Sequence, residues 1–168
     1  MPTKEQIEQI IKELQRILRI QDWDINFKYV TEAEARDIYG EDCSGGNLRK
    51  RHSEESYIII NQDNDKVKNM PNYWYHTLVH ELYHIVTDSF IYVVDDSRQF
   101  IPDEKARKEW KETTNVKYEE LVNKLAKGFV NAYPISNFDH ILNHTAALTL
   151  QMAGMSGLTP IMKGGETL

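Results

Sequence analysis

No stretch of this chain constrains its fold more than His80–His84, with the sequence HELYH. The segment around it, from about Tyr73 to Asp88, has apolar residues at steps of three and four, as a packed helix requires. On a helix, side chains four positions apart lie on one face, so both imidazoles can bind a single metal ion. This segment is therefore expected to be a helix with a metal site on one face. Its predicted core residues are Trp74, Leu78, Leu82, Ile85 and Val86.

Glu81 follows the first histidine and projects to the side of the two imidazoles. A carboxylate at that position can hold and deprotonate a metal-bound water without itself binding the metal. Zinc is the favoured ion, because imidazole and carboxylate ligands in an open tetrahedron suit it and lower the pKa of bound water to about 7. In the alternative interpretation, His80 and His84 are ordinary core or surface histidines that flank a glutamate.

A catalytic zinc site usually has three protein ligands, so the rest of the chain must supply one more. The metzincin pattern, HExxHxxGxxH, is excluded because Thr87 and Phe90 occupy its glycine and third histidine positions. A glutamate on a later helix remains, and residues 118–126 form such a helix. Its apolar face, which must pack inward, comprises Tyr118, Leu121, Val122, Leu125 and Phe129.

Two adjacent glutamates compete for the role of third ligand. At 100° per residue, Glu119 lies at the edge of the apolar face, whereas Glu120 points nearly opposite to it. Asn123 follows Glu119 by four and could hydrogen-bond a metal-bound histidine. Glu119 is the predicted ligand and Glu120 the fallback, while in a third reading both are solvated charges on a surface helix.

The motif His80-Glu81-x-x-His84, with a glutamate on a following helix, resembles the gluzincin clan of zinc metallopeptidases. More narrowly, the chain is similar to the small single-domain metallopeptidases of phages, prophages and plasmids, and to the ImmA/IrrE type, whose members cleave repressor proteins. The resemblance covers roughly Trp23 to Phe129. It implies an α+β, zincin-like domain over residues 1–137, with residues 138–168 as a C-terminal helix and a mobile tail. Where Asn123 stands, gluzincins often have aspartate.

The resemblance also implies where the substrate lies. In the family, the substrate backbone runs along an edge strand beside the metal helix, and Ser56–Asn61 is the strand expected there. The group that stabilises the oxyanion, apart from zinc, is open among Tyr133, His140 and His144.

Charge and composition limit the other partners. The chain has 168 residues, a net charge of −6 and a pI near 5.5, and its lysines and arginines are dispersed among acids, which argues against nucleic-acid binding. Cys43 is the only cysteine, so no disulfide within the chain is expected. No signal-peptide pattern or membrane-spanning run is present, so a cytoplasmic protein is expected.

Before the metal helix, the pattern predicts a helix, strands and a loop. Thr3 to about Arg19 is an amphipathic helix with a capping-box start, and Thr31 starts a short helix that Gly40 ends. The predicted strands are 23–29, 47–50 and 56–61. Gly45-Gly46 is interpreted as a turn, and Asn61–Asn69 as a surface loop.

After the metal helix, a short apolar piece, Phe90–Val94, precedes a mostly helical stretch from about Asp103 to Ala132. A break is possible around residues 113–115. Phe138–Met155 could form one more helix, and the tail from Ser156 is expected to be mobile.

Several other polar residues are candidates for a functional role. His76 lies on the same helical face as His80, where a substrate-side or structural role is favoured over ligation. Asp88 could accept the second ring proton of His84, or simply face solvent. His140 and His144 could clamp an oxyanion or bind a second ion, but no role is the favoured reading. Tyr83 is expected to pack.

The function predicted from these residues is that of a zinc-dependent metallopeptidase acting on a specific protein or peptide. His80, His84 and Glu119 would hold the ion, and Glu81 would take a proton from water and pass it to the leaving amine. The first alternative is a catalytically weak zinc-binding domain that serves a mobile element as a protein-interaction module. The second is a metal-free helical interaction module.

Overall fold

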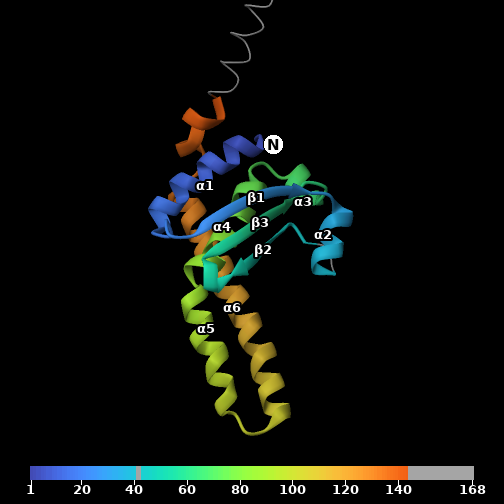
Figure 1. Cartoon of the computed structure of the whole chain (residues 1–168). Helices are drawn as coiled ribbons and strands as arrows, with labels where there is room; N and C mark the ends of the chain where they lie inside the picture. Colours follow the sequence, from blue (N-terminus) through green and yellow to red (C-terminus); the bar gives the residue numbers. More distant parts are fainter. Residues whose placement is uncertain (41–42, 144–168) are drawn as a thin grey trace, which may run out of the picture.

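A small mixed sheet with helices on both faces forms the body of the protein, so the chain is α+β. The computed structural model describes residues 1–40 and 43–143. Within these ranges the elements are α1 (Lys4–Leu18), β1 (Asp24–Val30), α2 (Glu32–Tyr39), β2 (Gly45–Lys50), β3 (Glu55–Asn61), α3 (Asp65–Asn69), α4 (Tyr73–Val86), α5 (Asp88–Ser97) and α6 (Glu104–Ala132) (Figure 1). Short 3-10 turns lie at Arg51–Ser53, Arg98–Phe100 and Ile135–Phe138.

The first two helices begin and end as their sequences predict. Thr3 and Thr31 each form a capping box, in which the threonine side chain accepts from the backbone three residues on and that residue's side chain accepts from the threonine backbone. Gly40 ends α2 in the left-handed conformation, with φ of 75°, which glycine adopts without steric cost.

The strand order is β1-β3-β2, with β1 parallel and β2 antiparallel to β3. The prediction that Ser56–Asn61 is the edge strand is therefore wrong: β3 is the central strand. The physical reason lies in Ile58, Ile59 and Ile60, which are all buried because helices cover both faces of the sheet. The edge strand nearest to α4 is β2.

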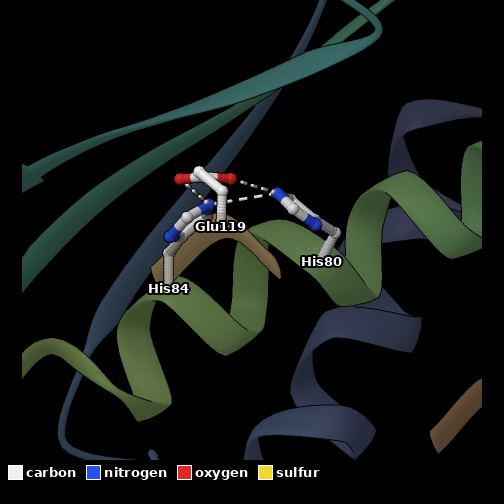
Figure 2. A group of neighbouring side chains, drawn as sticks. All are labelled: His80, His84 and Glu119. Atoms are coloured by element: carbon white, nitrogen blue, oxygen red, sulfur yellow. Dashed lines mark hydrogen bonds and ion pairs between the residues drawn. The ribbon is translucent and has the colours of Figure 1, made fainter. Parts of the chain in front are cut away.

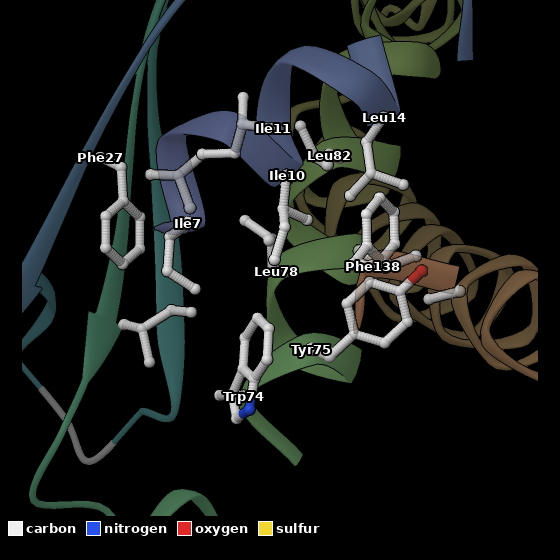
Figure 3. Packing of buried hydrophobic residues seen from close by; sticks show 14 of the residues in the cluster. Ile7, Ile10, Ile11, Leu14, Phe27, Trp74, Tyr75, Leu78, Leu82 and Phe138 are labelled. Atoms are coloured by element: carbon white, nitrogen blue, oxygen red, sulfur yellow. The ribbon is translucent and has the colours of Figure 1, made fainter. Parts of the chain in front are cut away.

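The main core lies between one face of the sheet and the helices α1 and α4 (Figure 3). On α1 the isoleucines and leucine of its apolar stripe are buried, and on α4 Tyr75, Leu78 and Leu82 meet them. On the opposite face of the sheet, α2 covers a smaller cluster formed by Val30, Ala35 and Ile59. The sheet thus holds α4 rigidly along its length.

Three local predictions need correction. Gly45 and Gly46 are the first residues of β2 and do not form a turn. The loop predicted at Asn61–Asn69 contains the short helix α3, whose N-cap Asn64 accepts a hydrogen bond from the Lys66 amide. The helix α6 runs through residues 113–115 without a break.

The helices α5 and α6 extend together beyond the sheet as a hairpin (Figure 1). Because the hairpin projects beyond the sheet, several of its apolar residues are exposed to solvent. The side chain of Phe100 is 78% exposed. Val86, Leu121 and Leu125 were predicted to pack inward, but they are 38%, 40% and 36% exposed. The buried side chains of α6 are Tyr118, Val122 and Ala126.

The end of the described chain returns to the main core. Phe138 and Ile141 are buried there, and the Gln6 amide donates to the carbonyl of Leu142 at 2.9 Å. The rest of the helix predicted at Phe138–Met155, and the predicted mobile tail, lie outside the described residues. Among residues 1–40 and 43–143, no helix is long and apolar enough to cross a membrane.

Two isoleucines of α1 offer a matched test of this packing. Ile10 is fully buried, whereas Ile17 is 37% exposed although it belongs to the same predicted stripe. Ile10→Ala should lower the free energy of unfolding by about 2–5 kcal/mol, because it leaves a cavity in the core. Ile17→Ala should lower it by less than about 1 kcal/mol. Urea denaturation of both variants measures the difference, and equal losses would contradict this arrangement.

Candidate metal site

Two helices bring the predicted ligands together. His80 and His84 lie one turn apart on α4, and Glu119 reaches them from α6 (Figure 2). The Nε2 atoms of His80 and His84 are 3.1 Å apart. The two Glu119 oxygens lie 3.5 Å from those nitrogens, Oε2 from His80 and Oε1 from His84. Within the described ranges this is the group of three candidate ligands that could hold a metal ion.

The two histidine nitrogens have a separation that suits a tetrahedral ion. Zinc at about 2.0–2.1 Å from each nitrogen or oxygen ligand requires ligand atoms roughly 3.3 Å from one another. The two Nε2 atoms are 3.1 Å apart, and with one oxygen of Glu119 the three ligand atoms lie within 4.8 Å of one another. Two imidazole nitrogens and a carboxylate also form a donor set that zinc prefers.

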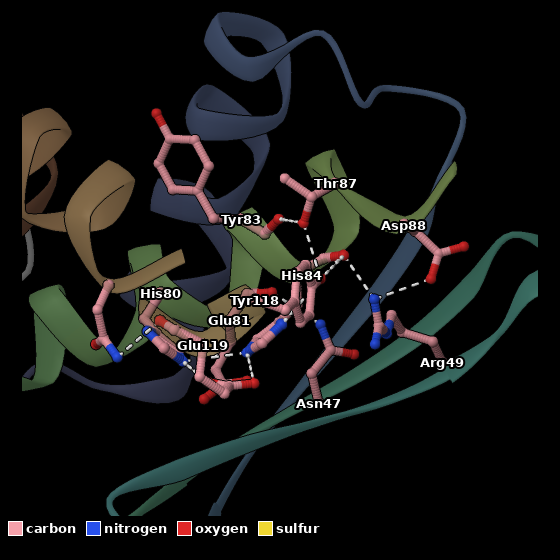
Figure 4. Close-up of polar contacts among 11 residues, drawn as sticks. Asn47, Arg49, His80, Glu81, Tyr83, His84, Thr87, Asp88, Tyr118 and Glu119 are labelled. Carbon is pink, nitrogen blue, oxygen red and sulfur yellow. Dashed lines mark hydrogen bonds and ion pairs between the residues drawn. The ribbon is translucent and has the colours of Figure 1, made fainter. Parts of the chain in front are cut away.

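A chain of hydroxyl groups fixes which nitrogen of His84 carries hydrogen (Figure 4). The Thr87 hydroxyl donates to the carbonyl of Tyr83 at 2.6 Å, so its oxygen must accept from the Tyr118 hydroxyl, 2.8 Å away. With its own hydrogen committed, the Tyr118 oxygen accepts from Nδ1 of His84 at 3.2 Å. The lone pair of His84 is therefore on Nε2, the atom that faces His80 and Glu119.

Asn123 lies beside His80. Its amide nitrogen donates to the backbone carbonyl of Glu119 at 2.9 Å, and hydrogen bonding with its side chain helps to raise the pKa of His80. A hydrogen bond can link the Nε2 atoms of His80 and His84, which are 3.1 Å apart, when His80 carries the hydrogen and His84 the lone pair. A metal ion would replace that hydrogen, so that both nitrogens bind the cation.

Burial and neighbouring charges set the ionisation of the three candidate ligands. Burial lowers the pKa of His84, which favours the neutral form that a metal needs. Burial also opposes charge on His80, but the hydrogen bond to Glu119 and the Glu81 charge outweigh it and raise the pKa of His80. The hydrogen bond from His80 lowers the pKa of Glu119, which keeps that carboxylate ionised.

Glu81 is the least exposed carboxylate of the site, at 6%, and it lies beside the start of the edge strand. Burial raises the pKa of Glu81 to about 7, partly offset by the positive charges of His80 and Arg49. Its Oε1 is 3.4 Å from the point where a Cβ on Gly45 would stand, and Thr77 would be closer still. A side chain at position 45 would therefore press on α4 and on this carboxylate.

Two side chains of β2 attach the edge strand to α4 (Figure 4). Asn47 donates to the carbonyl of Glu81 at 2.8 Å, and Arg49 donates to the carbonyl of His84 at 2.6 Å. Arg49 also pairs with the buried Asp88 at 2.9 Å. Asp88 was a candidate acceptor for the ring proton of His84; that role is taken by Tyr118, and Asp88 instead holds Arg49 in place.

The other residues singled out in the sequence lie elsewhere. Glu120, the fallback ligand, is exposed and pairs with Lys117 at 3.1 Å. His140 pairs with Glu13 of α1 at 2.9 Å. The ring of Tyr133 packs on Phe138, away from the site. His144 lies outside the described residues.

Tyr39 is a site residue that the sequence analysis missed. Its ring lies against Gly46, where a Cβ would stand on top of the phenol carbon and oxygen. The hydroxyl is buried and has no hydrogen-bond partner among the described residues, and burial together with the Glu81 charge raises the pKa of Tyr39. An unpartnered buried hydroxyl is costly and calls for a functional explanation. The glycine at position 46 was the one signal in the sequence for this close approach.

Three neighbouring cavities follow the edge strand β2. The central cavity, about 340 Å³, is lined by the three candidate ligands together with Tyr39, Glu81 and β2 residues. It shares His80 and Glu81 with a cavity of about 320 Å³ that contains Lys66, the Lys66 cavity. At the other end it shares Asn47 and Arg49 with a cavity of about 670 Å³ beside His52, the His52 cavity. Together they form a groove along the whole strand.

Comparison with models of protein families, with curated proteins and with solved structures finds no match to this chain. The chemistry of the site is therefore the basis for any functional conclusion.

Loss of the Tyr118 hydroxyl should weaken metal binding, because it leaves His84 free to adopt the other tautomer. We expect Tyr118→Phe to lower zinc affinity about 10–100-fold, measured by competition with a chromogenic chelator. Tyr83→Phe is the matched control, since it removes a hydroxyl from a half-buried ring on α4 that packs against Phe129. Unchanged affinity in Tyr118→Phe would contradict the hydroxyl chain.

The burial of Glu81 should make the metal-free protein less stable as pH rises. Its pKa is raised from 4.5 to about 7, so the folded protein holds this proton more tightly than the unfolded chain. The resulting stabilisation is complete below pH 4.5 and is lost as pH rises through 7, to a limit of about 3 kcal/mol. Glu81→Gln cannot ionise, so its advantage in unfolding free energy over wild type should grow from pH 5 to pH 8. Urea denaturation in a chelator would contradict this if the advantage stayed constant.

Proposed function

We propose that the protein is a zinc-dependent metallopeptidase of the gluzincin type. The observation that carries the proposal is the convergence of His80, His84 and Glu119, whose ligand atoms lie within 4.8 Å of one another, beside the buried carboxylate of Glu81. A zinc site that serves only stability or recognition does not need that carboxylate.

Zinc held by the three residues would polarise the scissile carbonyl and make water acidic enough to lose a proton near neutral pH. Glu81 takes that proton on its carboxylate as the water attacks, and then gives it to the leaving amine nitrogen. Burial opposes the ionised form of Glu81, which favours uptake of the proton that the carboxylate then passes on. Tyr118 holds the imidazole of His84 in the tautomer that presents Nε2.

The edge strand for the substrate is β2. The amide of Asn61 donates to the carbonyl of Ser44 at 3.0 Å, so in the antiparallel ladder the even-numbered residues of β2 face β3. The backbone N–H and C=O groups of Gly45, Asn47 and Arg49 are consequently directed to the open edge. An extended peptide can pair with them and pass the candidate ligands.

The groove favours cleavage inside a chain over removal of a terminal residue. Cavities continue from the central cavity in both directions along β2. An extended peptide rises about 3.3 Å per residue, so the groove accommodates residues on both sides of the scissile bond.

Tyr39 supplies a hydrogen-bond donor for this reaction. Its raised pKa keeps the hydroxyl protonated, and no described residue uses its hydrogen. Because Tyr39 lines the central cavity, a side-chain rotation that exposes its hydroxyl would let it donate to the substrate carbonyl oxygen as that atom becomes negative.

The test begins with zinc content per chain, measured by elemental analysis for wild type, Glu119→Ala and the matched variant Glu120→Ala. We expect about one zinc per chain in wild type and in Glu120→Ala and a strong loss in Glu119→Ala, because a site with two ligands binds weakly. Peptide hydrolysis is then measured for zinc-loaded wild type and Glu81→Gln, and should fall at least about 100-fold in the variant. Absence of stoichiometric zinc, even after zinc is supplied, would overturn the proposal.

A second candidate, a zinc-binding interaction module, is favoured by the exposed apolar residues of the α5–α6 hairpin. Phe90, Val93 and Phe100 are all largely exposed there, and exposed apolar residues on a projecting hairpin suit protein recognition. Stoichiometric zinc without any peptide hydrolysis would favour this candidate over the peptidase.

A further inference from the structure

The Lys66 cavity, at the N-terminal end of α4, presents hydrogen-bond donors and positive charge. Beyond the residues that it shares with the metal cluster, its main polar and aromatic lining comprises Asn64, Lys66, Tyr73, His76, Thr77 and Asn123. The only carboxylate in the lining is Glu81, at the boundary with the central cavity. The chain as a whole carries a net charge of −6, so the balance of charged side chains in this cavity differs from that of the chain.

The exposed ammonium group of Lys66 lies near an aromatic ring of the cavity. Its Nζ lies 5.9 Å from the centre of the Tyr73 ring, in a cation–π contact. The same ring stacks on His76, with centroids 5.8 Å apart and planes at 23°. Lys68, two residues further along α3, pairs with Asp63 at 3.1 Å, whereas no ion pair to Lys66 occurs among the described residues.

We propose that the Lys66 cavity binds a carboxylate of the peptide substrate. This inference rests on the proposed peptidase function, which it makes more specific. A lysine ammonium with an imidazole and amide groups beside it recognises a carboxylate by charge and by hydrogen bonds. Burial, His80 and Lys127 lower the pKa of His76, so Lys66 supplies the fixed charge and His76 a neutral N–H.

The position of this cavity determines which residue of the substrate can bind in it. Because it shares His80 and Glu81 with the central cavity, the bound carboxylate belongs to a residue within about two positions of the scissile bond. Two sources have the same chemistry: an aspartate or glutamate side chain within the peptide, and a terminal carboxylate.

Cleavage mapping on a peptide library tests the proposal. Zinc-loaded wild type is incubated with peptides of mixed sequence that carry free or amidated C-termini, and the cleaved bonds are identified by mass spectrometry. We expect aspartate and glutamate to be enriched at one fixed position from the cleaved bond. An enrichment that survives amidation identifies a side chain as the source, and one that requires the free C-terminus identifies the terminal carboxylate.

Charge reversal provides the decisive comparison. Lys66→Glu should lower kcat/KM for the preferred acidic peptides at least tenfold and raise it for peptides with lysine at the same position. Lys68→Glu makes the same charge change on an exposed residue outside the cavity, and should leave the preference intact. Cleavage by wild type without any acidic preference, or a preference unchanged in Lys66→Glu, overturns the carboxylate site and leaves the peptidase function standing.

If no peptide is cleaved, that outcome counts against the peptidase function. A binding measurement then tests the carboxylate site separately. The same library is then selected on immobilised zinc-loaded Glu81→Gln, with and without Lys66→Glu. Enrichment of acidic peptides that disappears with Lys66→Glu supports the carboxylate site, and equal recovery by both proteins overturns it.

Discussion

The close approach of two imidazole nitrogens across one helical turn sets the main constraint in this structure. The Nε2 atoms of His80 and His84 are 3.1 Å apart, so one hydrogen or one cation can lie between them. Tyr118, from α6, binds the opposite ring nitrogen of His84. The helix that supplies Glu119 thus also orients His84, and the packing of α6 on α4 is as important to the site as the ligand itself.

The edge strand is tied to the same helix. Asn47 and Arg49 bind carbonyl groups of Glu81 and His84, so the backbone that would align a substrate is fixed relative to the residues that would act on it. The two glycines that open β2 permit this closeness, because Gly45 lies against Thr77 and Gly46 lies against Tyr39. Preorganisation of this kind reduces the entropy lost when a substrate is oriented.

The sequence predicts much of this arrangement where the determinants are local. Helical spacing places His80 and His84 on one face, and the same arithmetic selects Glu119 over Glu120, which the structure indeed leaves outside the cluster. The capping boxes of α1 and α2 are confirmed. The chemical roles of His80, His84 and Glu119, by contrast, stay predictions.

Features that depend on tertiary contacts were not predictable from the sequence. An apolar run such as Ile58–Ile60 fits a strand, but its place in the centre of the sheet depends on β1 and β2 pairing on either side of it. A pair of glycines suits a turn as well as a tightly packed strand. Val86 and Leu121 have the periodicity of core residues, yet more than a third of each side chain is exposed. The role of Tyr118 depends on an approach to His84 across 34 residues of chain.

An edge strand kept open for a peptide is equally open to a strand from another copy of the protein. Natural sheets limit such pairing with short strands and charged residues at the edge. The strand β2 has both features, since it spans Gly45–Lys50 and ends in arginine and lysine. These two side chains are held there by ion pairs, Arg49 with Asp88 and Lys50 with Glu55, and a second copy of the strand would have to displace or desolvate them in order to pair at that end.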